Sequence, residues 1–278
     1  MFTQFAATES PLHISISADA LFYVWGFPVT NALVTGILGS LIAIAILVYA
    51  AGKVKRGKYN RFVGLVQWVF EGLLKQINDV IPNPEIRKKI MPLAVTIFFF
   101  VLINYWLSII PGLDTITWNG VPVLRSVTAD LNFTLALAII TIITVQIYAV
   151  KYLGSMANAK RYFRNPFKDP IGSFEGFLEL IGEASRGTAL ALRLFGNAFA
   201  GEVLLIVIAV LTSYFAAAVL PFFMIFELFI GFIQAYVFFI LTLIFTALAV
   251  SHHGPEDSHS KSDHSPAEPS KKKVAAKG

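Results

Sequence analysis

The stretch VTNALVTGILGSLIAIAILVYA, residues 29–50, contains no acidic or basic side chain. As an α-helix it would be about 33 Å long, which matches the roughly 30 Å hydrocarbon core of a lipid bilayer. A dense basic cluster follows it, comprising Lys53, Lys55, Arg56, Lys58 and Arg61. Because such clusters stay on the cytoplasmic side, residues 29–50 are predicted to cross a membrane from the outside inward.

The composition of the whole chain agrees with a membrane protein. Hydrophobic residues make up 56% of it and charged residues 14%, with a mean hydropathy of +0.69. Soluble domains carry about a quarter charged residues. The net charge of +5 comes from clusters beside the apolar runs. These clusters indicate the topology of the chain in the membrane and do not indicate nucleic-acid binding. No nucleic-acid partner is expected.

Further apolar runs have the length of membrane crossings: residues 90–110, 131–150, 171–212 and 220–250. A short outer turn near Ser213 and Pro221 is predicted between the last two. The run 171–212 would be about 60 Å long as one helix, so it must be tilted, bent or partly outside the hydrocarbon core. Every basic cluster falls on one side when the N-terminus is outside and the C-terminus is cytoplasmic.

The segment 62–81 differs from these runs because it is amphipathic. Its apolar residues recur at helical spacing: Phe62, Val66, Val69, Leu73, Ile77 and Val80. Charged residues, including Glu71, Lys75 and Asp79, occupy the other face. We therefore predict an interfacial helix here and not a spanning one.

The fold class is therefore predicted to be all-α: a polytopic helical membrane protein with about five crossings and one interfacial helix. Residues 1–28 form an outer N-terminal segment, residues 29–250 the helical membrane domain, and residues 251–278 a disordered polar tail. The tail is rich in Pro, Ser, His and Lys and has too little apolar surface to fold alone.

A stripe of polar residues marks the long run 171–212. Its members are separated by three, four or seven positions and so share one helical face: Glu179, Glu183, Arg186, Arg193 and Asn197. Charged groups in mid-membrane are rare and mark ion pathways or substrate sites, so Arg193 is the leading functional candidate. Glu183 and Arg186, three residues apart, form either a simple interfacial ion pair or part of the same pathway.

A second acid lies beyond Arg193 on the other side of the helix. Nine residues, about two and a half turns, separate Arg193 from Glu202, so the two side chains point in roughly opposite directions. This arrangement favours two incomplete aqueous paths over one continuous pore. In the last crossing Glu227 and Gln234 are seven residues apart and face the same way, so they could meet Glu202 and Asn197.

A secondary ion-coupled transporter and an integral-membrane enzyme are the alternatives. No internal repeat is evident, which weakens an inverted-repeat transporter. The chain has neither HExxH nor GxSxG. Four of its five histidines lie in the tail, at spacings that match no defined metal site. No metal and no cofactor are predicted.

Three motifs resemble subunit a of the membrane (Fo) sector of F-type ATP synthases. The sequence LRLFGN at residues 192–197, followed by AGE at 200–202, is similar to the signature of that family. Gln234-Ala235, with residues 238–242 after it, resembles the family's last-helix motif. TADLN at residues 128–132 resembles the start of its third crossing. The resemblance extends over residues 62–250.

The resemblance implies a role for each polar residue of the long run. Arg193 matches the family's essential arginine, and Asn197 and Gln234 match its polar neighbours. Glu179 matches the acid of the inner half-channel and Glu202 that of the outer one. Several bacterial members carry histidine where Glu227 stands here, so the outer relay would use two carboxylates.

The resemblance also implies a function and a set of partners. The chain would be a stator subunit that conducts protons through two offset half-channels to and from the carboxylates of a rotating ring, and it would not be catalytic alone. Expected partners are the ring of proteolipid c subunits, the peripheral-stalk b subunits, the other ATP synthase subunits and the lipid bilayer. The expected location is the cell inner (plasma) membrane. The ring supplies the ion-binding site, so H⁺ and Na⁺ both remain open.

Overall fold

The computed structural model describes residues 18–110, 116–118, 121–162 and 170–251. Within these residues, five helices are long and apolar enough to cross a membrane. They are α1 (Asn31–Lys55), α3 (Pro84–Ser108), α4 (Leu131–Leu153), α6 (Pro170–Thr212) and α7 (Ala216–Ser251). The prediction of an all-helical polytopic membrane protein is therefore confirmed. The predicted tail lies outside the described residues, except for Ser251.

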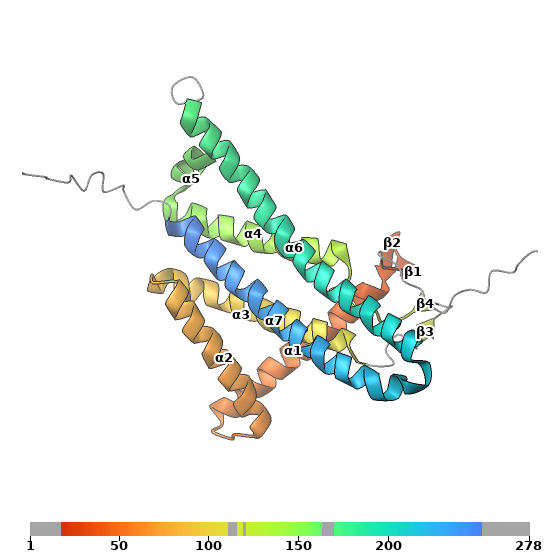
Figure 1. Ribbon diagram of the computed structural model, residues 1–278. Helices are drawn as coiled ribbons and strands as arrows, with labels where there is room; N and C mark the ends of the chain where they lie inside the picture. The colour runs from red at the N-terminus through yellow and green to blue at the C-terminus, as the bar shows by residue number, and fades with distance from the viewer. Residues whose placement is uncertain (1–17, 111–115, 119–120, 163–169, 252–278) are drawn as a thin grey trace, which may run out of the picture.

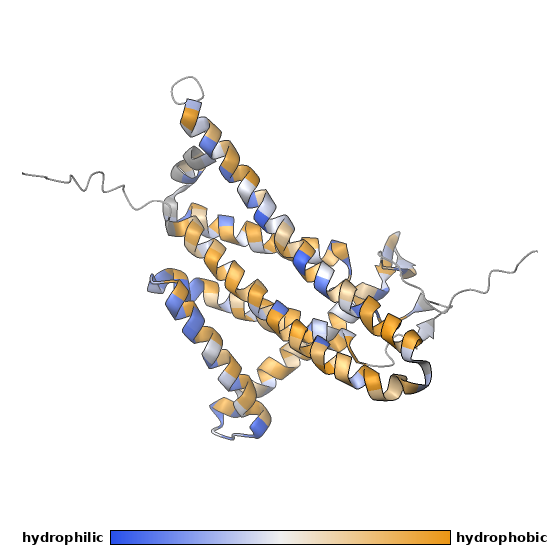
Figure 2. Ribbon diagram, in the orientation of Figure 1, coloured by the Kyte–Doolittle hydropathy of each residue, from blue (hydrophilic) through white to orange (hydrophobic). Residues whose placement is uncertain are grey.

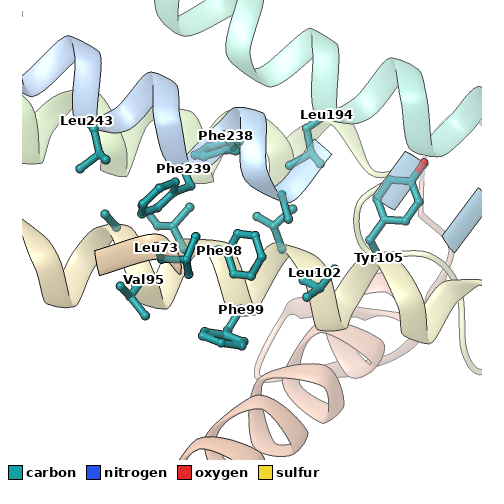
Figure 3. Close-up of a cluster of buried hydrophobic side chains, with 14 of the residues drawn as sticks. Leu73, Val95, Phe98, Phe99, Leu102, Tyr105, Leu194, Phe238, Phe239 and Leu243 are labelled. Atoms are coloured by element: carbon teal, nitrogen blue, oxygen red, sulfur yellow. The ribbon is translucent and has the colours of Figure 1, made fainter. Parts of the chain in front are cut away.

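The crossings pack as a bundle around α7. Helix α7 packs against α3, α4 and α6, and α1 covers another side of α3. Figure 1 shows α6 and α7 running side by side, with α5 beside the first turns of α6. Figure 3 shows the centre of the core, where Phe98 of α3 packs edge-on against Phe239 of α7 and Leu194 enters from α6.

Helix α2 (Arg61–Val80) is the predicted interfacial helix. It buries Val63, Val66, Leu73 and Ile77. Figure 2 shows hydrophilic residues along its length, in contrast to the mainly hydrophobic α7. Phe62 was expected on the buried face but is exposed, because the helix turns Val63 inward in its place.

Side-chain caps fix where the crossings begin. Thr30 Oγ1 accepts from the Leu33 amide before α1, and Asn83 Oδ1 accepts from the Glu85 amide before α3. Asp130 Oδ1 accepts from the amide of Asn132 before α4 at 2.9 Å. The first turn of a helix has unpaired N–H groups, which these oxygens satisfy. The TADLN motif therefore acts, at least in part, as a helix cap.

Two short β-hairpins and one short helix were absent from the sequence-based prediction. Strands β1 (Ala20–Val24) and β2 (Phe27–Thr30) form an antiparallel hairpin, and β3 (Thr117–Trp118) pairs with β4 (Val121–Pro122). The first hairpin turns at Trp25 and Gly26, both of which have positive φ, as tight hairpin turns require. Helix α5 (Ser155–Tyr162) follows Gly154, which ends α4 at a φ of 88°.

The turn between the last two crossings was predicted wrongly in one respect. It is a single 3₁₀ turn, η2 (Ser213–Phe215), and Pro221 lies inside α7. Pro221 falls in the second turn of α7, so it removes one helical N–H without ending the helix. Helix α6 is continuous over its 43 residues, about 65 Å. It exceeds the thickness of the hydrocarbon core, as the sequence predicted.

Candidate functional site

Helix α6 has two unlike faces around Arg193. One face is buried in the bundle and includes Leu190, Ala191, Leu194 and Ala198, all at most 5% exposed. The side chain of Arg193 lies outside this face and is exposed. Within the described part of the chain it has no hydrogen-bond or ion-pair partner. A guanidinium inside a membrane is costly unless a carboxylate or water meets it, so this exposed charge marks the face as a functional candidate.

Small residues surround Arg193 on the exposed face. Ala189 and Ala200 are exposed, and a Cβ added at Gly196 would meet nothing within 4 Å. Figure 2 shows that hydrophilic positions recur along α6 until its last turns become hydrophobic. Small residues allow another helix to approach closely in a membrane. This face therefore combines a charged group with a surface suited to close helix packing.

Asn197 and Gln234 join α6 to α7 one turn beyond Arg193. Asn197 Nδ2 donates to Gln234 Oε1 over 2.6 Å, as the spacing of the two residues predicted. Gln234 is 1% exposed, so this bond is made in a dry environment where polar groups need partners. The pair fixes the register of the two helices at the level of the arginine.

A cavity of about 20 Å³ lies between α3, α6 and α7, and Glu202 and Glu227 both line it. We call it the outer cavity, after the side on which the sequence predicts it to lie. A space of this size holds roughly one water molecule. Tyr105 of α3 donates its hydroxyl to Glu227 Oε1 at 2.6 Å. Figure 3 shows the oxygen of Tyr105 pointing away from the aromatic core. Ser108 and Ser126 add hydroxyl groups to the wall. The cavity can therefore bring water to two carboxylates.

Gly201 makes room for Glu227 beside the outer cavity. A Cβ at position 201 would lie 1.9 Å from Glu227 Oε1. Real Cβ atoms do not approach an oxygen so closely, and inside a helix glycine is less favourable than every other residue except proline. Its presence therefore serves the packing of Glu227 against α6.

A second cavity of about 20 Å³ lies near the opposite end of the bundle, and we call it the inner cavity after the predicted topology. Glu183 and Arg186 line it from α6, together with apolar residues of α4 and α7, among them Ile142 and Phe245. The Arg186 guanidinium lies 5.8 Å from the centre of the Phe245 ring, a cation–π distance. This cavity and the outer one share no lining residue, and Arg193 lies between them along α6.

Glu183 makes its contacts away from Arg186. Its Oε2 accepts from the hydroxyl of Tyr162 at 2.5 Å, and its Oε1 accepts from the side-chain amide of Gln146. No ion pair joins Glu183 to Arg186 in the described structure, so the simple ion-pair reading of these two residues is wrong. Glu179, one turn earlier, is half-buried and lines neither cavity.

Sequence reasoning missed Tyr105, Gln146, Ser126 and Tyr162. Gln146 carried a signal, because it is an amide in an otherwise apolar crossing and such groups need partners. Tyr105 gave a weaker one, since tyrosine is common at the ends of crossings. Tyr162 lies on the short helix α5, which the pattern of the basic loop did not reveal.

Comparison with known proteins identifies the family of this chain. The family model described as ATP synthase A chain matches residues 32–247. A Mycobacterium bovis protein described as ATP synthase subunit a is 30% identical over 238 residues, which cover 81% of this chain and 90% of the relative. The subunit a of Acidothermus cellulolyticus is 28% identical over 261 residues, covering 91% and 88%. A Vibrio campbellii protein described as ATP synthase subunit a 2 is 30% identical over 244 residues, covering 86% and 90%. The chain, with its five apolar helices and the arginine of α6, belongs to the ATP synthase A chain family.

Proposed function

We propose that this chain is the proton-conducting stator subunit of an Fo sector and that protons reach and leave the rotor through two separate paths that end on either side of Arg193. The observation that carries the proposal is the pair of disjoint cavities, one with Glu202 and Glu227 and the other with Glu183 and Arg186. Each holds roughly one water. About 24 Å of helix separates Arg186 from Glu202.

Arg193 explains why the two paths do not leak into each other. A guanidinium stays charged under all ordinary conditions, so a free proton meets a repulsive field there. A rotor carboxylate, in contrast, is attracted to the arginine in its ionised form and is accepted by lipid only when neutral. A proton can therefore pass from one path to the other only while it is bound to a rotor carboxylate, and this requirement couples proton flow to rotation.

The remaining site residues fit this scheme. Glu202 and Glu227, with Tyr105, load or unload the rotor from the outer path. Asn197 and Gln234 hold α6 and α7 in register beside Arg193. Glu179 lies on α6 toward the inner end and would collect protons at the mouth of the inner path, as the family resemblance implies. The alternatives, a secondary transporter and an integral-membrane enzyme, find no support in the comparisons.

The exposed surfaces support the proposed partners. The face of α6 with Ala189, Arg193 and Ala200 would meet the ring of proteolipid c subunits. Peripheral-stalk b subunits would hold the chain still, and an apolar groove of about 690 Å³ between α1, α2 and α3 offers their membrane helices a surface. We infer that the chain works with the other ATP synthase subunits in the cell inner (plasma) membrane, with its N-terminus outside and its C-terminus in the cytoplasm.

Cross-linking tests the rotor contact directly, because the sequence has no cysteine of its own. Single cysteines at Ala189 or Ala200, on the exposed face, should form disulfides with cysteines on the outer helix of the ring. A cysteine at Ala191, which is 0% exposed, is the matched control and should not. Efficient cross-linking from Ala191, or none from either exposed position, would contradict the proposed interface.

A further inference from the structure

A polar network joins α4, α5 and α6 beside the inner cavity. Gln146 Nε2 donates to both Glu183 Oε1 and the hydroxyl of Tyr162, the latter at 2.9 Å. Tyr162 in turn donates to Glu183 Oε2 at 2.5 Å. Asn158 Nδ2 donates to Gln146 Oε1 at 3.3 Å. Both carboxylate oxygens of Glu183 are therefore held by donors from two other helices.

Glu183 is the member of this network that reaches the inner cavity. It lines the same space as Arg186, while Tyr162 and Gln146 contact it from the other side. The carboxylate thus lies between the polar residues of α5 and a cavity that holds roughly one water. A group in that position connects the end of the bundle to the interior.

A purely structural tie between these helices would not require an acid. Neutral amides and hydroxyls can satisfy one another, whereas a half-buried carboxylate must be desolvated and then held by several donors. A carboxylate can also take up and release a proton, and a tyrosine hydroxyl can both donate and accept a hydrogen bond. The hydroxyl can therefore remain bonded to Glu183 in either protonation state.

We propose that Glu183 is a proton-carrying group of the inner path and that Tyr162, held by Gln146, is the positioning residue that orients it. The proposal rests on the proposed function and adds α5 to the conducting machinery. A proton leaving the rotor is carried by cavity water as hydronium. One O–H bond of that hydronium breaks as an O–H bond forms on Glu183, and the reverse exchange with water on the inner side releases the proton.

The surroundings of Glu183 allow this role to be tested cleanly. Among the side chains that the structure describes, the charged or titratable groups around it are Arg186 and Glu179 on its own helix and Tyr162 on α5. Helix α4 contributes the neutral Gln146 and apolar side chains, and α7 contributes apolar side chains that include Phe245. Removal of one oxygen at Tyr162 therefore changes the setting of the carboxylate without removing a charge.

The experiment measures passive proton conduction through the Fo complex in membrane vesicles under an imposed potential, over a range of pH, per assembled complex. Glu183→Gln should lower conduction roughly threefold to tenfold. Glu183→Asp, which keeps the acid, should restore part of it. Tyr162→Phe should lower conduction per complex and change its dependence on pH, because the carboxylate loses a donor.

Two matched controls separate chemistry from packing. Glu175→Gln removes an exposed acid two turns earlier on α6, and Tyr148→Phe removes a hydroxyl that bonds to the Lys89 carbonyl. Both should keep the conduction and pH profile of the parent. If Glu183→Gln or Tyr162→Phe lowers only the amount of assembled complex, with unchanged conduction per complex and an unchanged profile, Glu183 is a structural tie and the proposal is overturned.

The same vesicles distinguish this inference from the function on which it rests. If Arg193→Ala abolishes coupled pumping while Glu183→Gln behaves like the parent, only the role of Glu183 fails. If Arg193→Ala pumps normally, the proposed function fails as well. If Glu183→Gln does not assemble, the proposal is tested by Tyr162→Phe, which keeps the aromatic side chain and every charge. A parental pH profile of proton conduction in that variant overturns the proposal.

Discussion

Asn197 on α6 donates a hydrogen bond to Gln234 on α7 over 2.6 Å, one helical turn from Arg193. The two residues are 37 positions apart, and their contact sets how α6 and α7 meet at the level of the arginine. Because Gln234 is almost wholly buried, the bond is made where an unpaired amide is unfavourable.

This contact predicts strong coupling between two substitutions. Asn197→Leu and Gln234→Leu should each destabilise the helix pair by roughly 1–3 kcal/mol, because each leaves a polar partner unsatisfied. The double variant should be less impaired than the sum, with a coupling of roughly 0.5–3 kcal/mol. Thermal unfolding of the solubilised subunit would give these values. Strict additivity would mean that the two amides act independently.

Tyr105→Phe tests the outer cavity. The variant keeps the aromatic packing but removes the hydroxyl that bonds to Glu227, so we expect a loss of roughly 1–3 kcal/mol and an altered pH profile of ATP-driven acidification. Tyr214→Phe is the control, because the side chain of Tyr214 is 99% exposed. Indistinguishable profiles for Tyr105→Phe and the parent would remove Tyr105 from the relay.

Gly201→Ala should disable proton conduction although alanine favours helices. Its Cβ would lie 1.9 Å from Glu227 Oε1 and must displace that carboxylate. Gly64→Ala on α2 meets nothing within 4 Å and should be neutral or stabilise by up to about 1 kcal/mol. Dye-monitored proton flux through both variants is the measurement. Normal flux through Gly201→Ala would show that Glu227 can occupy another position.

Two substitutions of Asp130 distinguish a helix-capping role of this residue from a role in proton transport. Asp130→Ala should destabilise the subunit by about 1 kcal/mol, because the Asn132 amide loses its acceptor. Asp130→Asn should retain both stability and proton transport, since asparagine caps equally well. The test compares thermal stability with pumping rate per complex. A stable Asp130→Asn complex without pumping would show that the acid itself takes part in transport.

The crossings and the polar stripe of α6 could be predicted because the bilayer imposes a length and excludes charge. Residues 29–50 and Arg193 stand out from sequence alone for that reason. The meeting of Asn197 with Gln234 followed from helical spacing. The hydrogen-bond partners of Glu227 and Glu183 could not be predicted in this way. Tyr105 and Tyr162 lie on helices whose rotation and packing angle no local sequence pattern determines. The sequence predicts Pro221 in a turn because proline usually ends a helix. Its place inside α7 depends on packing against other helices, which no local pattern shows.

The positive charge of Arg193 alone is not sufficient for the mechanism. Arg193→Lys should also fail to support coupled pumping, because an ammonium lacks the planar fork of the guanidinium and is more strongly hydrated. ATP-driven acidification of vesicles checks this, with membrane insertion confirmed in parallel. Pumping by the lysine variant at the rate of the parent would show that any fixed positive charge at this position is enough.

The most direct measurement is proton flux in reconstituted vesicles that contain Arg193→Ala together with its rotor ring. Arg193→Ala should insert normally into the membrane, since the loss of a charge makes insertion easier. We expect no ATP-driven acidification and, under an imposed potential, a passive proton leak without rotation, because the barrier between the two paths is gone. Coupled pumping by Arg193→Ala at the rate of the parent would contradict the account.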